Sequence, residues 1–213
     1  MNYTNGRLIL NLHQEKIRLE KRHAGAQEEV KALHRFVEAL DELYWAGQKI
    51  MAEADILRAF DLLHFRTLNA VGATDGSIMV LDDRTDELVF WVVQGQAQFR
   101  LTGYRLPSNS GVAGWVVEAG CPVTVENAHQ DWRFSMRVDE VFGFETHSIL
   151  CVPIMDGRKL LGAIEFLNKG NNGSFNEADM TLALVLADVV SKGLIEIQRR
   201  SLKVIPRPVL AAA

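Results

Sequence analysis

The sequence is poor in the features that mark secreted, membrane-spanning and nucleic-acid-binding proteins. Its 213 residues contain two cysteines, Cys121 and Cys151, which are too few for a disulfide framework. No apolar run approaches the roughly 20 residues that a membrane helix needs, and the N-terminus lacks the pattern of a signal peptide. A net charge of −4 gives no general attraction to nucleic acid or anionic membranes. We therefore expect a cytoplasmic protein that binds neither membrane nor nucleic acid.

Composition and pattern divide the chain into three parts. With 48% hydrophobic and 23% charged residues, it is an ordinary globular sequence, long enough for one sizeable core. We expect a helical segment over residues 1–54 and a folded domain, including a C-terminal helix, over residues 55–203. Residues 204–213 are expected to form a loose tail.

A heptad-like seam in the N-terminal segment indicates a partner helix. Its residues follow alternating steps of three and four: Val30, Leu33, Val37, Leu40, Tyr44, Gly47, Met51 and Ala54. The last helix is apolar nearly all round between Leu182 and Val190, so one face can cover a sheet while another needs a partner. These patterns predict a homodimer, coiled-coil in character, held by the terminal helices. Packing of the seam on the chain's own sheet is the alternative.

Apolar and β-branched runs bounded by turn residues predict an antiparallel sheet, and hence an α+β fold. The expected strands cover residues 76–81, 87–94, 104–106, 121–125, 146–154 and 159–167. The expected helices cover residues 56–69, 111–119 and 176–200, with Asp55 as one N-cap and Asn176 and Asp179 as a capping-box-like pair. The middle helix starts with small residues after a loop, which leaves its backbone N–H groups open to a ligand. A sheet that bears such a helix forms a shaped, partly apolar pocket, which suits a small-molecule sensor.

Six pieces of the sequence, in their order and spacing, resemble the GAF domain family over residues 56–194. They are Gly76-Ser77-Ile78, residues 111–116, Asp131-Trp132-Arg133-Phe134, residues 148–154, residues 161–169 and residues 175–179. This resemblance implies a GAF-like, profilin-like central antiparallel sheet of about six strands. Helices from both chain ends would cover one face, and a ligand pocket would lie on the other. It also implies a regulatory module of signal transduction that dimerises through its terminal helices and passes its signal to a partner protein.

Family positions suggest which residues line that pocket. The expected ligand-binding residues are Ser77, Phe90, Val112, Ala113, Trp115, Phe134, Thr146 and Ser148. Ser77 and Thr146 would donate hydrogen bonds, and the backbone N–H groups of Val112 and Ala113 would receive an anionic or carbonyl group. The other aromatic side chains are expected mostly in the core. Relatives bind cyclic nucleotides, haem, bilins, amino acids or organic acids, and the fold does not choose among them.

One signature resembles that of the cyclic-nucleotide-binding relatives found with phosphodiesterases. Asn168, Lys169, Phe175 and Asp179 match it, whereas Met180 stands where those relatives have glutamate. In the relatives the lysine and aspartate form a salt bridge beside the pocket, so we expect a structural role for Lys169 and Asp179. The match makes a cyclic nucleotide one candidate ligand without selecting it.

Two alternatives to a sensor remain. The first is a scaffold that only dimerises and contacts other proteins, with its own side chains filling the pocket. The second, and weaker, is a thiol-dependent reductase of free methionine sulfoxide. Its chemistry needs a low-pKa thiolate and a resolving thiol, and the placement of Cys121 and Cys151 does not match that pattern. Neither cysteine suits bilin attachment, and His129 and His147 give little support to haem. No histidine or cysteine pair has zinc spacing, so we expect no metal and no catalytic residue.

Overall fold

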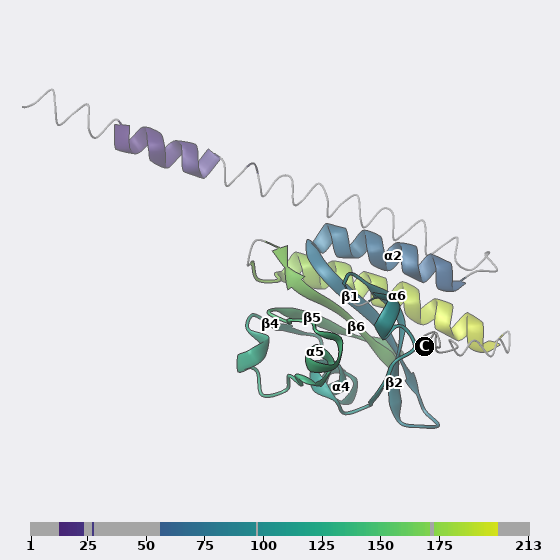
Figure 1. The fold of residues 1–213 in the computed structure, drawn as a ribbon. Helices are drawn as coiled ribbons and strands as arrows, with labels where there is room; N and C mark the ends of the chain where they lie inside the picture. The colour runs from purple at the N-terminus through teal and green to yellow at the C-terminus, as the bar shows by residue number, and fades with distance from the viewer. Residues whose placement is uncertain (1–12, 24–26, 28–55, 97, 171–172, 200–213) are drawn as a thin grey trace, which may run out of the picture. The chain divides into compact units, whose positions relative to one another are not determined.

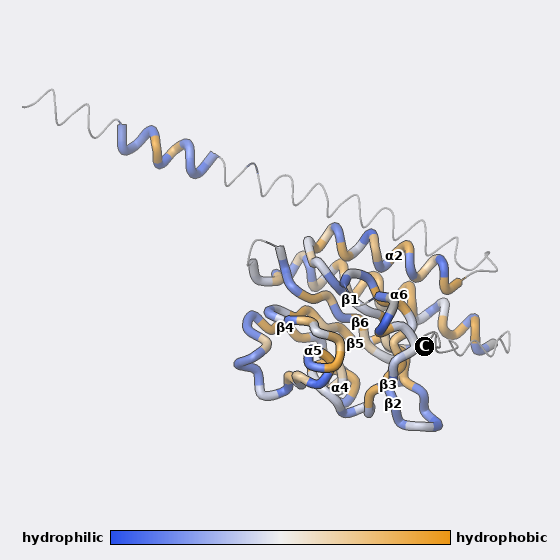
Figure 2. The backbone as a smooth tube through the Cα atoms, in the orientation of Figure 1, coloured by the Kyte–Doolittle hydropathy of each residue, from blue (hydrophilic) through white to orange (hydrophobic). Residues whose placement is uncertain are grey.

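The computed structural model describes residues 13–23, 27, 56–96, 98–170 and 173–199. Residues 13–23 are helical and exposed, carry the ion pair between Lys16 and Glu20, and belong to a unit separate from the sheet domain. Figure 2 shows that this helix is mostly hydrophilic. The seam from Val30 to Ala54 and the N-cap Asp55 lie outside the described residues, so the dimer helix stays a prediction.

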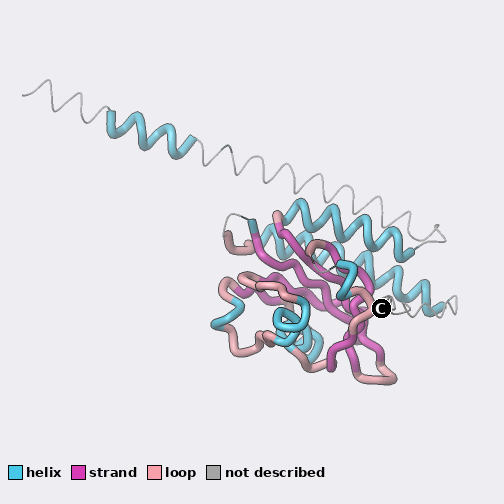
Figure 3. The backbone as a smooth tube through the Cα atoms, viewed as in Figure 1, coloured by secondary structure: helices cyan, strands magenta, loops and turns pink. Residues whose placement is uncertain are grey.

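A six-stranded antiparallel sheet forms the centre of the domain (Figures 1 and 3). Its order is β3-β2-β1-β6-β5-β4, and every neighbouring pair is antiparallel. The strands are β1 (Ala73–Asp82), β2 (Glu87–Gln94), β3 (Arg105–Pro107), β4 (Val123–Val125), β5 (Ile149–Asp156) and β6 (Lys159–Lys169). The expected α+β architecture is therefore confirmed.

Two long helices, α2 (Ile56–Val71) and α6 (Glu177–Arg199), cover one face of the sheet (Figure 1). Each turns an apolar stripe inward, so that Phe60, Leu182 and Leu186 are almost fully buried. Gly193 lets the helices approach closely, because a Cβ atom there would lie 2.5 Å from the Phe60 ring. The apolar run of α6 is thus largely covered within the domain. Leu184, 40% exposed, remains on its outer side.

The opposite face of the sheet is covered by short elements and their loops. These are α3 (Gln98–Leu101), α4 (Gly111–Ala119), the 3-10 turn η1 (Ala128–Gln130) and α5 (Arg137–Phe142). They enclose a second apolar core that includes Met79, Leu88 and Val116. None of the helices in the described part of the chain combines the length and apolarity needed to cross a membrane.

The expected strand over residues 146–154 is wrong at its start. β5 begins at Ile149, because the backbone N–H groups of Thr146 and His147 bind side chains instead of a neighbouring strand. The N–H of Thr146 donates to Asp139, and that of His147 donates to Asn168. β4 likewise begins at Val123 and not at residue 121.

Candidate functional site

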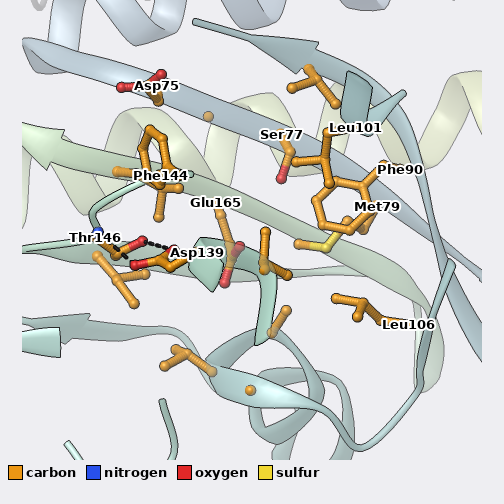
Figure 4. Close-up of a pocket in the computed structure, with 18 of the residues that line it drawn as sticks. Asp75, Ser77, Met79, Phe90, Leu101, Leu106, Asp139, Phe144, Thr146 and Glu165 are labelled. Atoms are coloured by element: carbon orange, nitrogen blue, oxygen red, sulfur yellow. Dashed lines mark hydrogen bonds between the residues drawn. The ribbon is translucent and has the colours of Figure 1, made fainter. Parts of the chain in front are cut away.

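A cavity of about 80 Å³ lies between the sheet and the short elements on its second face (Figure 4). Every strand except β4 contributes side chains from the sheet, and α3, α4, α5 and the adjoining loops contribute from the other sides. The apolar lining consists of Met79, Phe90, Val93, Leu101, Leu106, Val112, Ala113, Phe134, Val138, Phe144, Ile149 and Leu167. An apolar enclosure with a few polar groups is typical of small-molecule sites.

The start of α4 forms one wall because its residues are small. Gly111 has φ +67°, a backbone conformation that glycine adopts readily. At Gly114, a Cβ atom would lie 2.3 Å from the backbone of Asn109, so only glycine lets the helix lie against the preceding loop. Val112 and Ala113 follow in the first turn, where backbone N–H groups have no partner within the helix.

Asp139 ties α5 to the loop before β5. One carboxylate oxygen accepts the N–H of Thr146 and the other accepts its hydroxyl, each at 2.8 Å, and both residues are buried. The hydroxyl of Thr146, which we expected to serve a ligand, is therefore committed to Asp139. Arg100 connects α3 to the end of α5, because its guanidinium donates to the carbonyl oxygens of Val141 and Phe142.

Glu165 brings an ionisable group to the floor of the cavity. It lies on β6, and its carboxylate points toward the enclosed space (Figure 4). Burial, reinforced by the charge of Asp139, raises the pKa of Glu165 to about 7, although the thiol of Cys151 donates a hydrogen bond that opposes the shift. Burial also raises the pKa of Cys151, so this thiol is protonated and is a poor nucleophile.

The structure places six of the eight expected ligand-binding residues in the cavity lining: Ser77, Phe90, Val112, Ala113, Phe134 and Thr146. The remaining two are not among the lining residues. Trp115 lies under the guanidinium of Arg133, 4.6 Å from the ring centroid, and the hydroxyl of Ser148 accepts the N–H of Lys169. Whether any of the eight binds a ligand stays a prediction.

Sequence reasoning missed the cavity's acidic residues, Asp75, Asp139 and Glu165. Glu165 had a visible signal, since it interrupts an apolar run in a strand that pairs on both sides. Asp75 gave none, because a carboxylate beside a strand start is common. Trp132 is also unlike the expectation for most aromatic residues, being 84% exposed.

The phosphodiesterase-like residues meet where β6 ends and α6 begins. The ammonium of Lys169 donates to Asp179, which also accepts the N–H of Asn176, and the side chain of Asn176 accepts the N–H of Asp179. The ring of Phe175 lies 5.5 Å from the same ammonium. Asn168, with φ 58°, holds the loop before β5 through Glu145 and His147. None of these residues lines the cavity, which agrees with a structural role.

The loop between η1 and α5 is held by a salt bridge. The guanidinium of Arg133 donates to both carboxylate oxygens of Asp131, at 2.8 and 2.6 Å. This contact lowers the pKa of Asp131, chiefly through the hydrogen bonds from Arg133. Phe134, which follows, can then line the cavity from a fixed position.

The antiparallel sheet thus has α2 and α6 on one face and a mainly apolar cavity on the other. A profile of the GAF domain family matches residues 55–194, and the chain belongs to that family. GAF domains are regulatory and sensory modules.

Cyclic-nucleotide phosphodiesterases are among the relatives found by sequence. The chain is 38% identical over 76 residues to the dual 3',5'-cyclic-AMP and -GMP phosphodiesterase 11 of Drosophila melanogaster. This match covers 35% of the chain and 5% of the relative, so the chain spans only a small part of the length of that protein.

Solved structures show the same fold. The GAF domain of a phosphoenolpyruvate-protein phosphotransferase from Coxiella burnetii has a TM-score of 0.70 at 23% identity, covering 78% of this chain and 98% of that one. The free methionine-R-sulfoxide reductase of Neisseria meningitidis, solved with its substrate, has a TM-score of 0.61 at 21% identity, covering 75% and 89%. Likeness at this identity shows the fold alone. The reductase hypothesis gains no support from it.

Proposed function

We propose that this chain is a non-catalytic, small-molecule-sensing GAF module in signal transduction. Its ligand occupies the cavity above Glu165, and the module acts as a homodimer through its terminal helices. The mainly apolar cavity with a few polar groups is the observation that carries this proposal. A pocket filled by the chain's own side chains, as the scaffold alternative requires, would leave no such space.

A cyclic nucleotide is a poor match for this cavity. The phosphodiesterase 11 relative acts on cyclic AMP and GMP, but the match covers 5% of its length. The phosphate of a cyclic nucleotide would meet three carboxyl groups and no basic side chain among the described lining residues.

The signal has a short route from the cavity to the helices. β1 and β6 contribute residues to the cavity on one face and support α2 and α6 on the other. A ligand that favours one arrangement of the wall formed by α3, α4 and α5 would shift, through β1 and β6, the packing of α2 and α6 on the sheet. Such a shift requires that the ligand bind the two arrangements with different affinity.

A thermal-shift screen with small polar metabolites tests the proposal. A ligand at about 100 times its Kd raises the melting temperature by roughly 5–10 °C, because it binds only the folded state. Ala113→Phe fills the cavity from α4 and should abolish the rise. Ala119→Phe, at the exposed end of the same helix, should keep it. No rise with any compound, alongside a dimer mass in light scattering, would favour the scaffold instead.

A further inference from the structure

The polar lining of the cavity has one sign of charge. Three carboxyl groups, those of Asp75, Asp139 and Glu165, reach it, and no lysine, arginine or histidine is among the described residues that line it. Anionic ligands would be repelled at close range in a medium of low polarity. A ligand that complements this lining carries a positive charge or donates hydrogen bonds.

Two of these carboxylates are already used by the protein. Asp75 accepts the N–H of Gln96 at 2.7 Å and the hydroxyl of Thr74 at 2.6 Å. Asp139 accepts both polar groups of Thr146. Their charges contribute to the potential of the cavity, but their oxygens hold its walls together.

Glu165 is different, because among the described residues its carboxylate has one side-chain hydrogen-bond partner, the weakly donating thiol of Cys151. Its carboxylate faces the cavity from the sheet (Figure 4). Glu165 is only partly exposed, and a carboxyl with so little compensation is costly in such surroundings unless a further group pairs with it. Glu165 therefore offers a ligand an acceptor that the protein itself leaves almost unused.

The rest of the lining favours an organic cation over a metal ion. No group of three or more histidine, cysteine, aspartate or glutamate side chains in the described parts of the chain could hold a metal. The rings of Phe90, Phe134 and Phe144 line the same space. Aromatic faces attract ammonium groups, and apolar walls suit a short carbon skeleton.

We propose that the cavity binds a small organic ammonium ion, whose charged nitrogen pairs with the carboxylate of Glu165. This inference rests on the proposed sensing function and names its ligand class. The short carbon skeleton lies against the apolar residues of α4 and β2. Glu165 is the residue that decides the charge preference.

Binding of such a cation is coupled to a proton. The groups near Glu165 are Cys151 on β5, Asp139 on α5, Asp75 on β1 and, close to Cys151, Arg133. With a pKa of about 7, Glu165 is partly protonated at neutral pH. A bound cation favours the carboxylate, so binding releases a proton and strengthens as the pH rises through this value.

Calorimetric titrations with molecules of matched shape test the charge preference. Choline is permanently charged, 3,3-dimethylbutan-1-ol is its neutral counterpart, and 3,3-dimethylbutanoate is an anion of similar shape. n-Butylammonium and 1-butanol form a second pair. We expect each ammonium ion to bind at least about tenfold more tightly than its neutral counterpart, and the anion not to bind.

Proton coupling provides a second readout. Choline should bind roughly tenfold or more tightly at about pH 8 than at about pH 5.5. Its binding heat should also differ between buffers of different ionisation enthalpy, as proton release requires. Because choline itself does not titrate, this dependence belongs to the protein.

Glu165→Gln should weaken choline binding by at least about thirtyfold and remove its pH dependence. If this variant does not fold, the matched ligand pairs and the pH dependence of choline binding to the unmodified protein still test the ammonium proposal. Equal binding of charged and neutral partners, or no binding of any ammonium ion, would overturn the ammonium proposal. If the metabolite screen yielded a neutral ligand, the proposed sensing function would be kept and only the ammonium proposal rejected. If the screen yielded no ligand, both proposals would be rejected.

Discussion

Asp179→Ala is expected to lower the free energy of unfolding by about 3 kcal/mol. Asp179 is buried and holds both Lys169 and the backbone N–H of Asn176. Its removal leaves a half-buried ammonium without its carboxylate and opens the capping box at the start of α6. Urea unfolding followed by circular dichroism measures the loss.

A matched change on the same helix is the control for this prediction. Asp188 pairs with Lys192 on the exposed side of α6, where both side chains are more than half exposed. Asp188→Ala should therefore change stability by no more than about 0.5 kcal/mol. Equal losses of unfolding free energy for the two variants would contradict the prediction, because the contacts of Asp179 would then stabilise the fold no more than an exposed ion pair does.

Replacing His64 by leucine is expected to stabilise the protein in acid relative to the unmodified chain. His64 lies on α2, is fully buried, stacks on Phe166 at 5.2 Å, and neither ring nitrogen makes a hydrogen bond of good geometry. Burial lowers its pKa from 6.5 to about 4, although the nearby Glu165 carbonyl partly opposes the shift. Below about pH 6.5, His64 is protonated in the unfolded chain but stays neutral in the folded chain. The free energy of unfolding therefore decreases as the pH falls toward 4.

The size of this effect follows from the lowered pKa. Between about pH 7 and pH 5 the relative gain of His64→Leu should be roughly 2 kcal/mol in urea unfolding. Glu165 acts in the opposite direction, because its raised pKa makes the folded state lose stability as the pH rises from 4.5 to about 7. Comparing variants at each pH removes that contribution.

An exposed histidine provides the comparison for the acid effect. The side chain of His147 is 60% exposed. His147→Gln should leave the pH profile of stability close to that of the unmodified protein. A gain for His64→Leu no larger than that of His147→Gln would contradict the assignment of acid sensitivity to the buried ring.

Local chemistry made much of the fold predictable. The strand over residues 87–94 and the helix over residues 111–119 match β2 and α4 in both bounds, because turn residues and a left-handed glycine at Gly120 mark their ends. The pair Asn176 and Asp179 likewise forms the reciprocal cap that its spacing indicates. The start of β5 was less predictable, since the competing acceptors are side chains outside the strand: Asp139, 7 residues from Thr146, and Asn168, 21 residues from His147.

The lining of the cavity was predictable only where family position fixes it. Trp115 was expected there, but its ring packs under Arg133, a contact that depends on how the Asp131 loop folds back. The acidic character of the cavity arises from three separate elements that only the tertiary fold brings together. The net charge of −4 is close to balanced, so the composition gives no sign that acidic side chains gather at one site.

The most direct test is a two-dimensional amide NMR titration with the compound that raises the melting temperature most. If the ligand occupies the cavity, the largest shifts will come from amides of its lining, such as those of Ser77, Ala113 and Glu165, and Ala113→Phe will abolish them. Shifts confined to surfaces away from these residues, or unchanged by Ala113→Phe, would contradict the account. So would a protein for which no compound produces a shift.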